Sequence, residues 1–306
     1  MNQTTIPHLE KPVSRLVMGV DNQKELKPAS IMFDDFMARG GNCFDTAFVY
    51  GSGVCETVFG QWMAARGVRD QIVLIGKGAH TPYCTPEHLS SQLETSLARL
   101  QTDVVDIYMM HRDNTDIPVS EFVDALNFHA RAGRVKAFGG SNWSMARVQE
   151  ANDYASSKGL QGFSVVSNNL SLARMVDPPW TGCISASDTE SRAWLTKNQL
   201  TLMPWSSQAR GFFVRGDEGF LEDEELVRCW YSPDNFVRLE RAKALALEKN
   251  CDPIQIALAY VLHQEFPTIP LIGPRNTSET ASSFKALEIK LSALEVKWLN
   301  LESDTR

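Results

Sequence analysis

The residue types that could do chemistry in this sequence are a tyrosine, a lysine, an aspartate and a histidine near the ends of apolar runs. Tyr50 lies in the loop just after Asp45, Lys77 closes the next apolar run, and His111 closes the one after that. A tyrosine phenol titrates near ~10, too high for efficient proton exchange near neutral pH. A nearby lysine ammonium lowers that pKa, and a carboxylate offsets the cost of burying the ammonium. We therefore interpret Asp45, Tyr50 and Lys77 as a proton-transfer set.

His111 adds a hydrogen-bond donor that could orient the oxygen of a bound carbonyl toward Tyr50. The set suits addition of a proton to that oxygen while another group delivers a hydride. Taken singly, each residue has an ordinary structural explanation, such as a helix cap for Asp45 or a core position for His111. Their shared placement at strand ends favours the catalytic interpretation. The sequence shows no activated nucleophile and no metal-ligand spacing, so we predict neither nucleophilic catalysis nor a metal site.

The elements that must position these residues form a regular alternation. Short apolar runs alternate with segments of helical period, a pattern typical of βα units and a parallel sheet. We expect strands near residues 15–19, 42–45, 72–76, 105–110, 137–141, 163–167, 201–205 and 269–272. Eight strands in a chain of 306 residues favour a (β/α)8 TIM barrel, as a single domain over residues 1–306. Such a barrel places its active site at the C-terminal ends of the strands.

Helix and loop signals support this division. Thr85-Pro86 and Asp252-Pro253 are typical helix starts, and a helix from about Ser120 is predicted to end near Gly133. The Gly-x-Gly-x-x-Gly turn of a doubly wound dinucleotide-binding sheet is not present in the sequence.

Two long stretches without periodicity, 173–190 and 211–234, follow the sixth and seventh expected strands. We expect them to be loops that shape a pocket.

Bulk properties exclude several classes of function. The formal net charge of -7 gives no electrostatic reason to expect nucleic acid or an acidic membrane surface as a partner. No stretch approaches the ~18 apolar residues that span a bilayer, and the N-terminus lacks a signal-peptide pattern. Six cysteines without metal-type spacing indicate reduced thiols. We therefore expect a soluble, cytoplasmic protein that acts on a small molecule.

With these residues and elements, the sequence resembles the aldo-keto reductase family over nearly its whole length. The segment Asp45–Tyr50 matches the family's catalytic motif in residue type and spacing, and Lys77 and His111 fall at its other two catalytic positions. The segment Gly133–Trp143 resembles the family's fifth-strand signature, Met203–Gly211 its seventh-strand signature, and Ile272–Asn276 the segment that holds the adenosine end of its cofactor.

The resemblance implies reversible hydride transfer between a nicotinamide and a carbonyl or alcohol carbon. It implies Tyr50 as general acid/base, Lys77 as the residue that adjusts its pKa, Asp45 as partner of Lys77, and His111 as the residue that orients the carbonyl. It also implies a set of cofactor-binding residues, namely Gly19, Asp21, Ser141, Asn142, Ser167, Trp205, Ser206, Gln208, Arg210, Gly273, Arg275 and Glu279. Among these, Ser141 and Asn142 would bond the carboxamide, Trp205 would stack on the nicotinamide, and the loop after Trp205 would wrap the pyrophosphate.

The sequence departs from the family pattern at three places. Ser167 stands where the family usually has a glutamine, with Asn168 beside it as the longer amide. Arg275 suits the 2′-phosphate of NADP(H), which we favour, but Glu279 would repel that phosphate, so NAD(H) stays an alternative. Asp21 could bond a ribose hydroxyl or the substrate, or cap the next helix.

The substrate class stays open between two interpretations. Four aromatic side chains could wall an apolar or aromatic aldehyde pocket, namely Phe48, Trp143, Trp180 and Trp230. Alternatively, Asp21, Asn22 and Arg112 would suit a polyol or sugar. A nicotinamide-binding regulatory subunit with little turnover and a barrel enzyme of another class are the competing functions. Oligomeric state and reaction direction leave no signal in the sequence.

Overall fold

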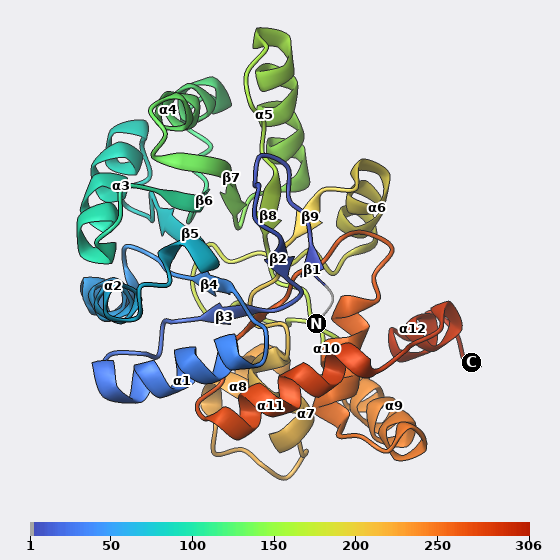
Figure 1. Cartoon of the computed structure of the whole chain (residues 1–306). Coiled ribbons are helices and arrows are strands. Elements are labelled where there is room, and N and C mark those ends of the chain that lie inside the picture. The colour runs from blue at the N-terminus through green and yellow to red at the C-terminus, as the bar shows by residue number, and fades with distance from the viewer. Residues whose placement is uncertain (1–2) are drawn as a thin grey trace. The chain divides into compact units, whose positions relative to one another are not determined.

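The computed structural model describes residues 3–306, which divide into two compact units along the chain. The first runs to Ser167 and includes Gly273–Thr277. The second comprises Asn168–Ile272 and Ser278–Arg306. Figure 1 labels the elements of both units along the colour-ramped chain.

The first unit contains six parallel strands joined by helices. Each strand pairs with the next one in the chain, so that the order from β3 to β8 follows the sequence. The strands are β3 (Val17–Gly19), β4 (Cys43–Asp45), β5 (Val73–Gly78), β6 (Val105–Met110), β7 (Val135–Ser141) and β8 (Val165–Ser167). The helices between them are α1 (Leu26–Ala38), α2 (Val54–Arg66), α3 (Pro86–Leu100), α4 (Val119–Arg131) and α5 (Met145–Lys158). An antiparallel hairpin of β1 (Gln3–Thr4) and β2 (Val13–Ser14), which the sequence did not predict, precedes them.

The second unit continues the alternation. Its strands are β9 (Thr201–Leu202) and β10 (Leu271–Ile272). Its helices are α6 (Thr189–Asn198), α7 (Phe212–Arg215), α8 (Glu224–Trp230), α9 (Pro233–Lys249), α10 (Pro253–Leu262), α11 (Thr277–Lys285, which begins at the last residue of the first unit) and α12 (Ala293–Leu299).

The predicted (β/α)8 class is confirmed, because each of the eight expected strands is present among residues 3–306 with helices between them. The single-domain assignment stays a prediction. Thr85 caps α3 by accepting a hydrogen bond from the His88 N–H, and Asp252 and Gln255 form a capping box at α10. Gly133 follows α4 with a φ of 73°, the left-handed conformation expected of a glycine after a helix.

One loop prediction was wrong. The stretch 211–234 contains α7, α8 and the start of α9. Helix α8 spans only seven residues, too short for a clear periodic pattern, and it begins where the Asp223 side chain accepts a hydrogen bond from the Leu226 N–H. Local capping therefore formed a helix that hydrophobic periodicity did not reveal.

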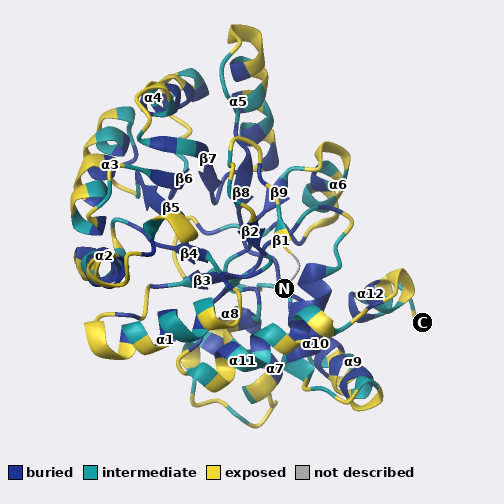
Figure 2. Ribbon diagram, in the orientation of Figure 1, coloured by how far each residue is buried: buried dark blue, intermediate teal, exposed yellow. Residues whose placement is uncertain are grey.

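Strand alternation decides which face of β4 each residue occupies. Phe44 packs into an aromatic cluster with rings from α1 and α2, at centroid distances of 5.7 Å to Phe33, 5.2 Å to Phe36 and 5.4 Å to Trp62. Because successive side chains point to opposite faces, Asp45 projects from the face opposite this cluster. Figure 2 shows the buried strands and the exposed outer sides of the helices that cover them.

A second acidic residue is buried near the N-terminal end of β6. Asp106 accepts a hydrogen bond from the Leu74 N–H at 3.0 Å. Its carboxylate forms ion pairs with Lys11 at 3.0 Å and Arg69 at 2.9 Å. Within residues 3–306, no helix combines the length and apolar character needed to cross a membrane.

Candidate active site

Parallel pairing brings the ends of β4, β5 and β6 together. Asp45 lies opposite Ile75, and the ladder continues past β4, because the Phe48 N–H donates to the carbonyl of Lys77 at 2.8 Å. On the other side of β5, the His111 N–H donates to the carbonyl of Gly78 at 2.6 Å. Backbone hydrogen bonds thereby fix Asp45, Lys77 and His111, which are far apart in the sequence, at neighbouring strand ends.

The turn after β4 places Tyr50. Tyr50–Gly53 forms a short 3₁₀ turn in which Gly53 has a φ of 93°. A Cβ atom at Gly53 would lie 2.4 Å from the guanidinium carbon of Arg99, so only glycine fits there. Arg99 donates to the carbonyl of Phe48 and to the carboxylate of Glu56, both at 3.0 Å. A guanidinium from α3 therefore anchors the turn that carries the tyrosine.

The four predicted catalytic side chains lie together. The ammonium of Lys77 donates to the Asp45 carboxylate, and both side chains are only 3% exposed. The same ammonium lies 5.1 Å from the centre of the Tyr50 ring. The rings of Tyr50 and His111 meet edge to face with their centroids 5.7 Å apart.

The titration properties of Asp45 and Tyr50 follow from burial and mutual charge. Burial raises the pKa of Asp45, and the charge of Lys77 opposes that shift. The pKa of Tyr50 is raised well above its ordinary value, first by burial and then by the charge of Asp45. The sequence led us to expect a lowered value for Tyr50. The difference arises because burial and the adjacent carboxylates of Asp45 and Asp21 outweigh nearby positive charge.

His111 is held as a neutral imidazole. Its pKa is lowered well below the ordinary value, first by burial and then by the charges of Lys77, Arg112 and His80. The Nδ1 atom of His111 is buried without a hydrogen-bond partner among the described residues. The ring of His80 meets that of His111 edge to face at 5.0 Å. A neutral imidazole can offer one N–H to a carbonyl oxygen without carrying charge.

The two residues expected to bond a carboxamide lie at the end of β7. The Ser141 hydroxyl donates to the carbonyl of Ser167 at 3.0 Å, and the Asn142 amide donates to the Ser141 hydroxyl at 3.1 Å. The Asn142 N–H also bonds the Ser167 carbonyl, at 3.1 Å. The polar groups of Ser141 and Asn142 are thus gathered at one strand end within the same unit as the four side chains predicted to be catalytic.

The other predicted cofactor residues divide between the two units. Gly19 pairs with Asp45 at the end of β3, and Asp21 is exposed just beyond it. Asp21 does not cap α1, because the N-terminal cap of that helix is Glu25. Gly273 and Arg275 belong to the segment of the first unit in which the Pro274 carbonyl accepts a hydrogen bond from the Asn22 side chain at 3.2 Å.

Five predicted cofactor residues lie in the second unit, namely Trp205, Ser206, Gln208, Arg210 and Glu279. The carbonyl of Trp205 accepts a hydrogen bond from Asn169 at 3.0 Å, and the Trp205 ring lies 6.3 Å from that of Trp180. Arg210 forms an ion pair with Glu225 at 2.6 Å. Each of these contacts is internal to the second unit.

Comparison with known proteins decides the family. The sequence model of the Aldo/keto reductase family matches residues 18–300. The chain belongs to this family. One similar protein is the uncharacterized oxidoreductase YrpG of Bacillus subtilis (strain 168), 26% identical over 94% of this chain and 91% of the relative.

Two further relatives are named for an activity. The norsolorinic acid reductase stcV of Emericella nidulans is 29% identical over 88% of this chain and 70% of its own length. An aryl-alcohol dehydrogenase [NADP(+)] of Phanerodontia chrysosporium is 28% identical over 88% of this chain and 74% of its own length. Family membership and these relatives support oxidoreductase activity on carbonyl compounds.

In this aldo/keto reductase, two of the aromatic residues considered as substrate walls are packing residues. Trp143 and Trp230 are fully buried. The Trp143 indole N–H donates to the carbonyl of Arg112 at 3.2 Å, and a Cβ atom at Gly140 would lie 2.6 Å from the Trp143 ring. Trp180 is 49% exposed and is covered by the Arg210 guanidinium at 5.5 Å.

Sequence reasoning missed His80 as a neighbour of the site. Its only signal is its position shortly after Lys77, in the loop that follows β5. Arg112 was considered only as a polyol contact. It is 5% exposed, and its charge acts on both Tyr50 and His111. The signal for Arg112 was its adjacency to His111.

Proposed function

We propose that this aldo/keto reductase interconverts an aldehyde or ketone and its alcohol, with Tyr50 as the general acid/base. The observation that carries the proposal is the cluster of Tyr50, Lys77, Asp45 and His111 at adjoining strand ends. A bound nicotinamide cofactor supplies and accepts the hydride in this proposal. The four side chains then orient the carbonyl group and exchange its proton.

Each side chain has a role that its surroundings support. The hydroxyl of Tyr50 donates its proton to the carbonyl oxygen, and neutral His111 donates a hydrogen bond to the same oxygen. Asp45 compensates the charge of Lys77 beside the tyrosine ring. Because burial and the charge of Asp45 raise the pKa of Tyr50, its phenol carries the proton that reduction of a carbonyl consumes.

The polar groups of this chain support a nicotinamide cofactor, with NADP(H) favoured over NAD(H). Ser141 and Asn142 offer a hydroxyl and an amide side by side at the end of β7, which matches the needs of a carboxamide. We assign the ring and the pyrophosphate to the second-unit residues Trp205, Ser206, Gln208 and Arg210. Arg275 suits a 2′-phosphate, and the name of the Phanerodontia relative, an aryl-alcohol dehydrogenase [NADP(+)], supports NADP(H).

An aryl aldehyde or ketone is the proposed substrate class, supported by the names of the aryl-alcohol and norsolorinic acid relatives. The buried cation Arg112, whose charge acts on His111, favours ring substituents that accept hydrogen bonds. The net charge of -7 supports a small molecule rather than a nucleic acid as the partner.

Titration of the protein with NADPH and with NADH, followed by tryptophan fluorescence, tests cofactor binding. A screen of substituted benzaldehydes and sugars with both nucleotides then tests turnover. Tyr50→Phe should keep nucleotide affinity and lose turnover by about 10²–10⁴-fold. Absence of nucleotide binding would refute the proposal, and binding without any turnover would support the regulatory alternative.

A further inference from the structure

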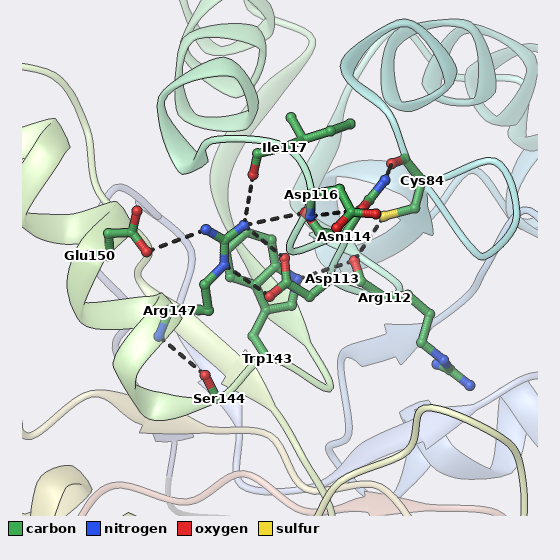
Figure 3. A network of polar contacts seen from close by, with 10 residues as sticks. All are labelled: Cys84, Arg112, Asp113, Asn114, Asp116, Ile117, Trp143, Ser144, Arg147 and Glu150. Carbon is green, nitrogen blue, oxygen red and sulfur yellow. Dashed lines mark hydrogen bonds and ion pairs between the residues drawn. The ribbon is translucent and has the colours of Figure 1, made fainter.

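Arg147, at the start of α5, holds the loop that follows β6 through several hydrogen bonds. Its Nε atom lies 3.0 Å from Oδ2 of Asp113 and one terminal nitrogen lies 3.2 Å from Oδ1, which makes a two-point ion pair. The same terminal nitrogen donates to the carbonyls of Asn114 at 3.4 Å and Ile117 at 3.0 Å. Arg147 and Asp113 are mostly buried, with side chains 14% and 11% exposed. Figure 3 shows the guanidinium at the centre of these contacts.

The same network ties the loop to its neighbours on both sides. The carbonyl of Arg112 accepts the indole N–H of Trp143, just before α5, and the thiol of Cys84, in the loop after β5, each at 3.2 Å. The Asn114 side chain donates to the carbonyl of Cys84 at 3.1 Å. Loops after three consecutive strands are therefore connected through the backbone on either side of Asp113.

This loop begins at His111. In Figure 3 the Arg112 side chain points away from the network, while its carbonyl is held within it. The Arg112 charge acts on Tyr50, His111 and His80. The position of the Arg112 backbone therefore determines where the His111 imidazole and the Arg112 guanidinium lie relative to Tyr50.

We propose that Arg147 and Asp113 are positioning residues for the reaction, which fix His111 and Arg112 against Tyr50 through the loop after β6. The inference rests on the proposed function for its kinetic consequence. Its structural consequence can be measured without turnover. Bidentate geometry matters because an arginine fork fixes both the distance and the orientation of its carboxylate partner, which a single charge does not.

Glu150 supplies a matched control. It is a second carboxylate partner of the same guanidinium, at 3.3 Å, but its side chain is 55% exposed and it lies on α5 itself. Asp113→Asn and Glu150→Gln each replace one carboxylate of Arg147 by an amide of the same shape. Only the first weakens the connection to the loop.

The kinetic test compares these variants with the wild type, using whichever aryl aldehyde and nucleotide the screen identifies. Asp113→Asn should lower kcat/KM by roughly 10–100-fold, because small misplacements of catalytic groups are costly. Glu150→Gln should stay within about twofold of the wild type, as expected for an exposed pair. Nucleotide affinity should change little in both, since Ser141 and Asn142 are held by Ser167 rather than by the loop.

The second readout is the titration of His111 by NMR, assigned with His111→Gln. In the wild type the charges of Lys77, Arg112 and His80, together with burial, keep its pKa well below the ordinary value. Displacement of the loop in Asp113→Asn moves Arg112 away and admits water, so the pKa of His111 should rise toward the ordinary value of about 6.5. Glu150→Gln should leave the titration unchanged.

Arg147→Lys keeps the experiment decisive if Asp113→Asn does not fold, because lysine retains the charge but cannot form the two-point pair. Arg147→Lys should show the same lower kcat/KM and the same rise in the pKa of His111. Asp113→Glu, which keeps a carboxylate, should show a smaller change in both quantities than Asp113→Asn. A variant with a lower melting temperature but wild-type kcat/KM and wild-type His111 titration would overturn the inference. If the wild type turns over no carbonyl, the proposed function fails, and the His111 titration alone still decides the inference.

Discussion

The buried pair of Asp45 and Lys77 gives a quantitative prediction for stability. Asp45→Asn leaves the Lys77 ammonium in a site where its side chain is 3% exposed, without its carboxylate. Removal of one partner of a buried ion pair costs about 3–5 kcal/mol of unfolding free energy, because the remaining charge is uncompensated. At about 2 °C per kcal/mol, which suits a long chain, the melting temperature should fall by roughly 6–10 °C.

The reciprocal change should behave differently with pH. Lys77→Met leaves the Asp45 carboxyl, whose pKa burial raises and Lys77 opposes. Without Lys77 that pKa rises further. A carboxyl with a raised folded pKa contributes stability that is fully present below its unfolded pKa and is lost as pH rises through the folded value. The loss of unfolding free energy in Lys77→Met, relative to the wild type, should therefore shrink as the pH is lowered from 8 toward 5. This range lies above the unfolded pKa of about 3.9. The loss in Asp45→Asn should not shrink in this way.

Thermal and urea unfolding followed by circular dichroism would measure both effects and their coupling. The double variant Asp45→Asn/Lys77→Met should recover most of the loss, because it leaves no uncompensated charge. Glu240→Gln is the control, since it breaks the exposed pair with Lys243, whose side chains are 70% and 49% exposed, and should cost less than about 1 kcal/mol. A melting temperature of Asp45→Asn equal to that of this control would refute the reasoning.

Two further predictions concern β5 and His111. Gly78→Ala should destabilise the protein by about 1–3 kcal/mol, because its Cβ would lie 2.0 Å from the Tyr108 hydroxyl. Gly76→Ala is the control and should be nearly neutral, because its Cβ would lie 3.4 Å from the nearest atom, a ring carbon of Tyr108. Equal melting temperatures of the two variants would contradict this. The pKa of His111 is lowered in the folded protein, so below about pH 6.5 the unfolded chain takes up a proton that the folded chain does not. The free energy of unfolding should therefore fall by up to ~1.4 kcal/mol per pH unit in that range. Unfolding between pH 8 and 5 should show a slope that His111→Gln reduces, and an unchanged slope would count against a buried neutral imidazole.

The strands and the proximity of Asp45, Lys77 and His111 were predictable from the sequence for the same reason. Parallel strands end at one edge of a sheet, so polar residues at the ends of consecutive apolar runs are brought together by backbone pairing alone. Asp45, Lys77 and His111 needed nothing beyond the register of β4, β5 and β6 to meet. The position of Tyr50 needed a tight turn with glycines after β4, and also the Arg99 side chain of α3, which holds that turn and has no signal in the sequence.

Features that depend on contacts between distant side chains were not predictable. The burial of Trp143 follows from a glycine beneath its ring and from the carbonyl of Arg112, neither of which has a local signature. The raised pKa of Tyr50 depends on burial, which residue types alone do not reveal. Helix α8 and the hairpin of β1 and β2 are too short to show periodicity.

Asp106 gives the first unit a second buried acid with a different task. Its two cationic partners and the Leu74 amide lie near the N-terminal ends of the strands, whereas Asp45 lies at their C-terminal ends. Substitutions that strengthen or weaken the contacts of Asp106 with Lys11 and Arg69 therefore change the free energy of unfolding but leave the geometry around Tyr50 as it is. Such a separation lets substrate preference drift by mutation at one end while compensating mutations accumulate at the other. In a laboratory selection for new carbonyl substrates, a stabilising substitution beside Lys11 or Arg69 would leave the residues around Tyr50 in place.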